Sequence, residues 1–577
     1  MHDVPTWVAK HQETRSVTDL LQQAPEVVSE AVDDWALREP GRRMLYDGAR
    51  RRWWTYGQVV AATDAIAANL QGHGVRPGDR VATYLRDPLP GVLWMYASWR
   101  LGAVFSPLND GYDGEILTYL IDDTAPAVIL TEQKQLARLL PAIEASPLSP
   151  LVVSTDDDAA PLPEGVLREP EFHVACTWER PAVGFADPAC VIYTSGTTGP
   201  AKGVIISHRW MAQYTWLARQ LTTPDDVVYS DLPLYHVGGA VFCIARASWS
   251  GAGVGLWDKF STSRFWERID EVGATMATLM DVMTPWLMNA PEGPDDTRNT
   301  LKLVTMQPLP SNHREIAQRF GIDFVLAGFG QTESGHVLAA LLEECPPGTG
   351  TPDELYRGLS HEEISARVLS AGGCFMDGAN VNKKGFMGRP NPWYEVAVLD
   401  DDGTPLPAGV TGELGLRPKA PALLSLGYLN KPEATAGAWR DLWFHTGDAV
   451  LADDDGFLYF VERMGSRIRR RGENVTAYFV EELIRRHPAV DMAAAFGVPS
   501  AEGDEDDIVV AVTVVAGAAL EPPALLAWAE NELPRFMCPQ HVIVVPAIPT
   551  TPTGKIQKFR LREDFLHARD ASTKGPR

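Results

Sequence analysis

A run of twelve residues from Tyr193 to Val204 constrains this chain more than any other part of its sequence. It consists of Tyr-Thr-Ser-Gly-Thr-Thr-Gly-Pro-Ala-Lys-Gly-Val, and so combines serine and threonine hydroxyls with a lysine. Gly196 and Gly199 allow a sharp turn and a close approach of the backbone to a ligand. Backbone N–H groups, hydroxyls and a lysine are suitable donors for a polyphosphate. Apolar residues on both sides predict flanking strands, so we expect a phosphate-binding loop between two strands.

The run differs from the common P-loop, in which Gly-Lys is followed by Ser or Thr and opens a helix. Here Ala201 precedes Lys202 and Gly203 follows it. A polar surface turn is the alternative, but it would suit a shorter stretch without the lysine. We therefore expect these residues to bind nucleotide phosphates: Thr194, Ser195, Gly196, Thr197, Thr198, Gly199 and Lys202.

Length and composition favour a soluble protein with more than one domain. At 577 residues the chain is too long for a single core. It contains neither the about 18 uninterrupted apolar residues of a membrane span nor an evident secretory signal, so we expect a cytoplasmic location. The six cysteines form no Cys-x-x-Cys pair, which favours reduced thiols over a zinc site. A formal net charge of −24 at pH 7 argues against a nucleic-acid partner.

Strand-like apolar runs alternate with helical periods through most of the chain, which predicts α/β layering. Two such runs are 81–85 and 127–130, with a buried helix expected between them at 91–100. Within 343–388 a further helix is expected, because Ser360 and Glu363 have capping-box spacing.

Segments 54–57, 78–81 and 102–109, together with the phosphate loop, resemble the adenylate-forming superfamily of acyl-CoA synthetases, luciferases and peptide-synthetase adenylation domains. The resemblance covers nearly the whole chain. It implies a large multi-layer α/β domain over residues 1–464, which would bind ATP and substrate. A smaller, mobile α+β domain would follow over residues 465–577. Relative to this family the 343–388 segment is long, so we expect an insertion near the active site.

The sequence Gly-Phe-Gly-Gln-Thr-Glu-Ser at 328–334 resembles a second family motif. By this resemblance Phe329 stacks on adenine, Thr332 reaches a phosphate oxygen and Glu333 binds Mg²⁺. A single glutamate suffices, because magnesium takes one or two carboxylates together with phosphate oxygens and water. A glycine turn with a surface glutamate is the alternative. The motif also contributes Gly330 and Gln331 to the nucleotide site and Gly328 to the substrate pocket.

Trp-Phe-His-Thr-Gly-Asp, which ends at Asp448, resembles the family's ribose-binding motif. An ionised aspartate accepts hydrogen bonds from two vicinal hydroxyls, so we expect Asp448 to bind ribose. Arg463 is implied as a second ribose contact. The alternative for Asp448 is a turn aspartate beside Gly447.

Two further positions are implied by the resemblance in the carboxy-terminal part of the chain. Lys555, in Pro-Thr-Thr-Pro-Thr-Gly-Lys-Ile, corresponds to the mobile catalytic lysine, whose ammonium would stabilise charge as the adenylate forms. Gly465 corresponds to the hinge, where glycine allows a large change in backbone torsion. Four arginines between 467 and 471 would contact coenzyme A phosphates or simply form a solvated basic face.

The expected acyl pocket is the third part of the site. Residues 232–239 resemble the segment that lines this pocket, with His236 at its mouth, although a lone histidine is more often structural. Met306 and Gln307 stand where relatives have small residues. We therefore expect their bulk to shorten or reshape the pocket.

Together these motifs predict an AMP-forming acyl-CoA ligase that uses ATP, Mg²⁺, a small carboxylic acid and coenzyme A. An alternative is an enzyme that activates nitrite as an adenylate to diazotise an aromatic amine, because Met306 and Gln307 are compatible with a small pocket. A non-catalytic binding protein on the same scaffold is a third hypothesis. Retention of Lys202, Glu333 and Lys555, together with Asp448, argues against it.

Overall fold

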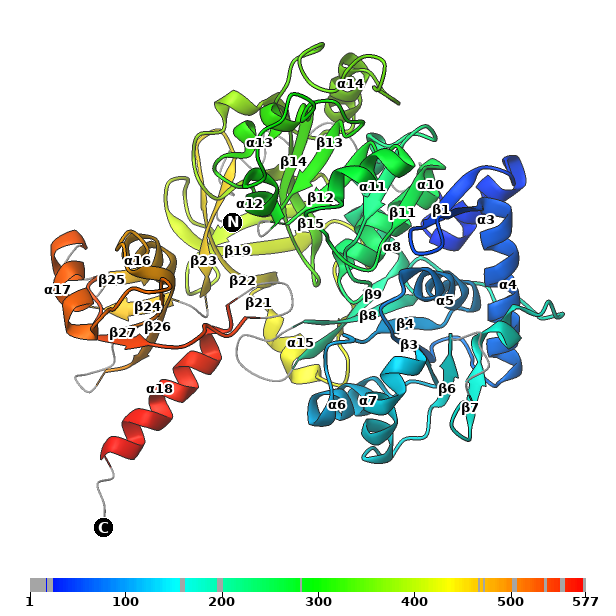
Figure 1. The fold of residues 1–577 in the computed structure, drawn as a ribbon, viewed down its shortest axis with the longest axis horizontal. Helices are drawn as coiled ribbons and strands as arrows, with labels where there is room; N and C mark the ends of the chain where they lie inside the picture. The colour runs from blue at the N-terminus through cyan, green and yellow to red at the C-terminus, as the bar shows by residue number, and fades with distance from the viewer. Residues whose placement is uncertain are drawn as a thin grey trace.

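The computed structural model describes Val17 and residues 24–155, 161–194, 201–280, 283–464, 467–470, 473–500, 506–533, 537–550 and 556–573. Two large sheets carry the main body (Figure 1). The eight-stranded sheet has the order β20 (Gly427–Tyr428), β9 (Lys202–Ser207), β8 (Pro188–Thr194), β4 (Val104–Pro107), β3 (Arg80–Tyr84), β5 (Val128–Thr131), β6 (Leu151–Ser154), β7 (Val166–Arg168).

The second large sheet of the main body has fifteen strands. Its order is β18 (Tyr394–Leu399), β19 (Thr411–Pro418), β22 (Trp443–Ala452), β23 (Leu458–Arg463), β17 (Phe386–Pro390), β15 (Gly335–Glu343), β14 (Phe324–Gln331), β13 (Leu303–Met306), β12 (Met276–Leu279), β10 (Val227–Ser230), β11 (Gly253–Leu256), β1 (Arg43–Asp47), β2 (Arg52–Thr55). Two short strands pair at its side, β16 (Phe375–Asp377) with β15 and β21 (Trp439–Arg440) with β22.

Helices connect and cover these strands, as parallel pairing requires crossover connections. In the main body they are α3 (Val28–Arg38), α4 (Tyr56–Gly72), α5 (Pro88–Leu101), α6 (Gly114–Thr124), α7 (Gln133–Glu144), α8 (His208–Tyr214), α9 (Trp216–Gln220), α10 (Arg246–Ser250), α11 (Phe265–Val272), α12 (Met283–Met288), α13 (His313–Phe320), α14 (His361–Ser370) and α15 (Pro432–Ala438). Three other helical segments are the 3₁₀-helical η1 (Glu169–His173), the π-helical η2 (Gly238–Ala245) and the 3₁₀-helical η3 (Gly378–Asn380).

Local sequence signals account for the predicted helices. The buried helix expected at 91–100 is α5, which Asp87 caps by accepting a hydrogen bond from the Leu89 N–H and which ends at Gly102 with φ of 68°. The capping box of α14 is also confirmed, because Ser360 and Glu363 exchange side-chain and backbone hydrogen bonds. The strands expected at 81–85 and 127–130 are β3 and β5.

The carboxy-terminal elements build a separate small sheet with its own apolar core. β26 (Val490–Pro499), β27 (Asp506–Val514) and β28 (His541–Val544) form this sheet, and β24 (Arg467–Arg470) with β25 (Glu473–Thr476) forms a two-stranded ribbon. The helices here are α16 (Ala477–Ile484), α17 (Pro522–Glu532) and α18 (Lys558–Thr573). In Figure 1 these elements, coloured gold to red, lie on one side of the larger body.

This arrangement confirms the predicted fold class, a large α/β domain followed by a smaller α+β domain. The boundary between residues 464 and 465 stays a prediction, because Gly465 lies outside the described residues. Every helix in the described part of the chain is too short or too polar to span a bilayer.

Candidate functional site

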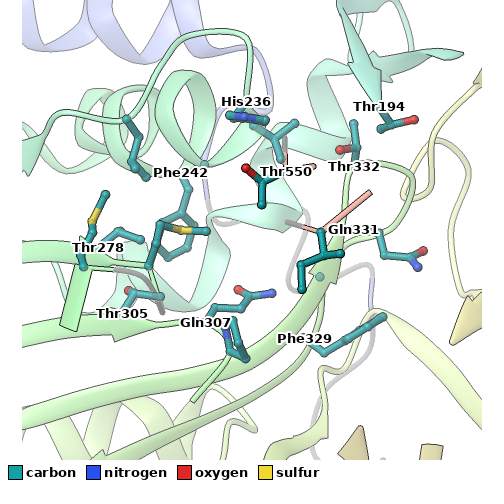
Figure 2. Close-up of a pocket in the computed structure, with 18 of the residues that line it drawn as sticks. Thr194, His236, Phe242, Thr278, Thr305, Gln307, Phe329, Gln331, Thr332 and Thr550 are labelled. Atoms are coloured by element: carbon teal, nitrogen blue, oxygen red, sulfur yellow. The ribbon is translucent and has the colours of Figure 1, made fainter. Parts of the chain in front are cut away.

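A cavity of about 2450 Å³ lies where the two large sheets and the small domain meet. Both large sheets contribute strand ends and loops to its wall, and α16, β26 and α18 contribute residues from the small domain. Figure 2 shows Thr194, Gln331 and Thr332 toward one end of this cavity. Phe242, Thr278 and Thr305 gather toward the other end, with Gln307 between the two groups.

The strands that flank the phosphate-binding run form as expected. β8 ends at Thr194 and β9 begins at Lys202, and these two residues stand opposite each other in the antiparallel pair. Both line the cavity. The loop residues between them that we expect to bind phosphates, Ser195, Gly196, Thr197, Thr198 and Gly199, lie outside the described residues.

Tyr428 connects the lysine of this run to the glutamate of the second motif. The Lys202 ammonium lies 5.1 Å from the centroid of the Tyr428 ring. The Tyr428 hydroxyl donates a hydrogen bond of 2.9 Å to Oε1 of Glu333, which lies in the turn between β14 and β15. Burial and the neighbouring Glu333 raise the pKa of Tyr428, so the phenol stays neutral. The lysine expected to bind phosphate and the glutamate expected to bind a metal ion thus meet at one aromatic side chain.

Asp448 lies at the centre of a second polar cluster on the cavity wall. It is only 1% exposed, and its two carboxylate oxygens accept hydrogen bonds from Arg463 Nη1 at 2.8 and 2.9 Å. Gln331 donates through Nε2 to the same carboxylate and to the backbone oxygen of Thr446. The structure therefore brings together three expected nucleotide-site residues from β14, β22 and β23.

The glycines of the second motif are required by close packing. A Cβ on Gly328 would lie 2.2 Å from Nε2 of His336, and a Cβ on Gly330 would lie 2.6 Å from the backbone oxygen of Gly335. Neither distance is sterically tolerable for a side chain. Phe329 and Thr332 line the cavity beside them, at the positions expected to face the nucleotide.

In the acyl pocket the structure contradicts one expectation. His236 and Gln307 line the cavity, but Met306 is fully buried in the apolar core on the opposite face of β13. Side chains alternate between the two faces of a strand, so Thr305 and Gln307 face the cavity while Met306 faces away. Met306 therefore cannot shorten the pocket.

Two titratable residues in the cavity wall were missed from the sequence. Burial lowers the pKa of His336 to about 4 and raises the pKa of Asp231 to about 6. Asp231 also accepts a hydrogen bond of 2.7 Å from the Tyr229 hydroxyl. His336 follows the second motif directly and could have been included with it. No comparable local signal marks Asp231 or Tyr428.

The long segment between 343 and 388 lies mostly away from the cavity. Its helix α14 is tied to the far end of β14 and β15, where His361 contacts Glu343 at 2.7 Å and Asp323 at 3.1 Å. Within this segment only residues 383–387 line the cavity, so the expectation of an insertion near the active site is wrong for most of it.

Three expectations cannot be assessed in this structure. Lys555 and the hinge residue Gly465 lie outside the described residues, and the side chains of the arginines between 467 and 471 are likewise not described. Thr550 and Ile556, which flank the segment of Lys555, line the cavity.

Comparison with known proteins gives matches over most of the chain. Residues 32–429 match the family model described as AMP-binding enzyme, and residues 480–555 match the AMP-binding enzyme C-terminal domain. The crotonobetaine/carnitine–CoA ligase of Proteus mirabilis (strain HI4320) is 27% identical over 522 residues, which cover 89% of this chain and 93% of that protein.

Solved structures with the same fold cover nearly the whole chain. ATP-bound MatB from Rhodopseudomonas palustris superposes with a TM-score of 0.73 at 22% identity, over 94% of this chain and 99% of that one. The anthranilate CoA ligase AuaEII in complex with anthranoyl-AMP gives a TM-score of 0.75 at 21% identity, over 96% and 100% of the two chains. At these identities the likeness establishes the fold.

Proposed function

Because the chain belongs to the family of AMP-binding enzymes, we propose that it is an AMP-forming ligase that joins a carboxylic acid to coenzyme A. In the first step a carboxylate oxygen attacks the α-phosphorus of ATP, and the bond to pyrophosphate breaks. In the second step the thiol sulfur of coenzyme A attacks the acyl carbon, loses its proton, and AMP leaves. The likeness to a CoA ligase along most of the chain supports coenzyme A as the acceptor.

The observation that carries this proposal is the meeting of Lys202 and Glu333 at Tyr428. Tyr428 contacts both the Lys202 ammonium, which can bind phosphate, and the Glu333 carboxylate, which can bind a metal ion. Glu333 fits Mg²⁺, because this ion takes few protein carboxylates and fills its shell with phosphate oxygens and water. Among the described residues no group of three or more histidine, cysteine or acidic side chains forms a metal site by itself.

The residues of the cavity then have distinct roles. Lys202 and Thr194 would hold phosphate oxygens, and Glu333 would hold Mg²⁺, which when bound would offset the negative charge of the phosphates. Asp448 accepts hydrogen bonds from the ribose hydroxyls and is oriented by Arg463. Phe329 offers an aromatic face to adenine. Lys555, moved by a hinge at Gly465, stabilises the charge that develops during adenylation.

The nitrite-activating alternative has no observation in its favour. It depended on Met306 and Gln307 as bulky pocket residues, and Met306 lies in the core instead.

The decisive experiment is ATP–pyrophosphate exchange with a panel of aromatic, short and fatty acids and nitrite, followed by thioester formation with coenzyme A. We expect exchange with a carboxylic acid and AMP release only when the thiol is added. Glu333→Gln and Lys555→Ala should each lower exchange by about 100-fold or more, as expected for loss of one preorganised charge. Exchange with nitrite alone, or acid-dependent exchange with no thioester, would contradict the proposal.

A further inference from the structure

Three aromatic rings in mutual contact line the end of the cavity that lies away from Thr194, where Figure 2 shows Phe242. The ring centroids of Tyr214 and Phe242 are 5.5 Å apart, those of Tyr214 and His336 are 6.2 Å apart, and those of Phe242 and His336 are 5.9 Å apart. All three side chains line the cavity. The two contacts that involve His336 are edge-to-face. An aromatic wall of this kind favours a flat ring over a flexible alkyl chain. The reason is that the ring of a ligand can make the same edge-to-face and stacked contacts with these side chains.

Two polar atoms on this wall are buried without a partner. Among the described residues, neither Nε2 of His336 nor Oγ1 of Thr305 has a hydrogen-bond partner. Both residues line the cavity, and they are 2% and 3% exposed. A buried polar atom left unpaired costs free energy that a bound hydrogen-bonding group recovers. The wall therefore has apolar faces for a ring and unused polar atoms for a substituent.

A buried cation lies behind the same wall. The guanidinium of Arg246 lies 4.8 Å from the centroid of the Phe242 ring and the side chain is fully buried. None of its three nitrogens has a hydrogen-bond partner in the described part of the chain. The charge of Asp226 acts on this guanidinium through space, without a hydrogen bond to it. A buried guanidinium in a region of low dielectric constant still disfavours a second cation nearby and favours an anion or a partial negative charge.

From these observations we propose that this end of the cavity binds an aromatic carboxylic acid with a hydroxyl substituent. Its ring packs against the wall formed by Tyr214, Phe242 and His336, and its hydroxyl hydrogen-bonds to Thr305 and His336. Arg246 disfavours acids that carry a trimethylammonium group. This inference rests on the proposed function, since it names the acid that the ligase activates.

The test is ATP–pyrophosphate exchange with the full-length protein and a fixed panel: benzoate, its three monohydroxy derivatives, octanoate and carnitine. We expect at least one hydroxybenzoate to exceed benzoate and octanoate by about tenfold in kcat/KM, as one satisfied buried hydrogen bond permits. Carnitine should give no exchange. Thr305→Val, which removes the hydroxyl at nearly constant volume, should abolish the preference for hydroxybenzoate over benzoate while the KM for ATP stays within twofold. Thr222→Val, at a buried threonine that bonds to Ala218, should leave the preference intact.

The outcomes separate this inference from the proposed function. Octanoate or carnitine as the best substrate would overturn the inference while the ligase assignment stands. If no acid supports exchange, the ligase assignment fails. The inference about the pocket is then decided by the affinities of hydroxybenzoate and benzoate, measured by calorimetry. Tighter binding of hydroxybenzoate that Thr305→Val abolishes would support it, and equal binding of the two acids would overturn it.

Discussion

Arg463 and Asp448 stand directly opposite each other in the antiparallel pair of β22 and β23, and one guanidinium nitrogen bonds both carboxylate oxygens at 2.8 and 2.9 Å. The carboxylate is buried, whereas the arginine side chain is 45% exposed. The pair thus presents an oriented carboxylate acceptor to the cavity.

Asp448→Asn should therefore weaken ATP binding. The amide keeps the shape but loses the charge that accepts from ribose and from Arg463, and hydrogen bonds to charged groups contribute about 1.5–3 kcal/mol. We expect the KM for ATP to rise roughly ten- to hundredfold. Glu395→Gln is the matched control, because Arg417 bonds Glu395 in the same way across β18 and β19 outside the cavity. A similar loss of ATP affinity in both variants would contradict a specific role for Asp448.

Tyr428→Phe removes the hydroxyl that Glu333 accepts from but keeps the ring that Lys202 contacts. A carboxylate that has lost one fixed donor is less well oriented for a metal ion. We expect about tenfold lower exchange activity, partly restored by higher Mg²⁺ concentration. Tyr356→Phe, whose hydroxyl bonds the backbone of Leu359, is the control and should leave the Mg²⁺ dependence unchanged. If Tyr428→Phe leaves the Mg²⁺ dependence of exchange unchanged, Tyr428 does not orient the metal ligand Glu333.

Substitution of Met306 should affect the stability of the protein, whereas substitution of Gln307 should affect which acids it accepts. Met306→Ala creates a void in the core and should cost about 2–5 kcal/mol of unfolding free energy without changing the range of acids. Gln307→Ala should change the acid preference with little loss of stability, since Gln307 faces the cavity. Urea unfolding and exchange against chain length measure both effects. If Met306→Ala instead extends activity to longer acids, Met306 faces the pocket after all.

Arg246 and Lys302 are both fully buried but differ in their partners. Lys302 pairs with the buried Asp226 at 2.9 Å, whereas the guanidinium of Arg246 has no hydrogen-bond partner among the described residues. Lys302→Met leaves the buried Asp226 carboxylate without its ion-pair partner and should cost about 3–5 kcal/mol. Arg246→Met removes a buried charge that makes no hydrogen bond and interacts with Asp226 only through space, so it should be neutral or stabilising by about 1–4 kcal/mol. Equal destabilisation in thermal unfolding would mean that Arg246 is paired in solution.

Burial lowers the pKa of His336 to about 4. As the pH falls below about 6.5 the unfolded chain binds a proton at this residue while the folded protein does not. The stability that neutral His336 provides is therefore present above about pH 6.5 and is lost as the pH falls toward 4, by about 3 kcal/mol in total. His336→Gln should remove this part of the pH dependence between pH 7 and 4.5, measured by urea unfolding. The exposed His567→Gln is the control, and a pH profile that is the same in His336→Gln and the wild type would contradict the prediction.

Patterns of neighbouring residues were sufficient to predict much of the fold. The strands on both sides of the phosphate-binding run, the buried helix α5 and the capping box of α14 all depend on residues close together in the sequence. The same holds for the motifs at 328–334 and around Asp448, whose resemblance to family motifs implies nucleotide binding. Three of these residues do meet in one cluster of hydrogen bonds.

Other features depended on how distant segments pack, and no local pattern could reveal them. The apolar run of β13 has side chains buried on both faces, so only the packing of the sheet decides that Met306 faces the core and Thr305 the cavity. Tyr428 reaches Glu333 across 95 residues of sequence because β20 pairs with β9 at the edge of the other sheet. The sequence by itself thus determined the elements and the nucleotide motifs, since these depend on short-range periodicity and residue chemistry. The tertiary structure alone decided the shape and polarity of the acyl pocket, because pairing between distant strands selects which side chains share a wall.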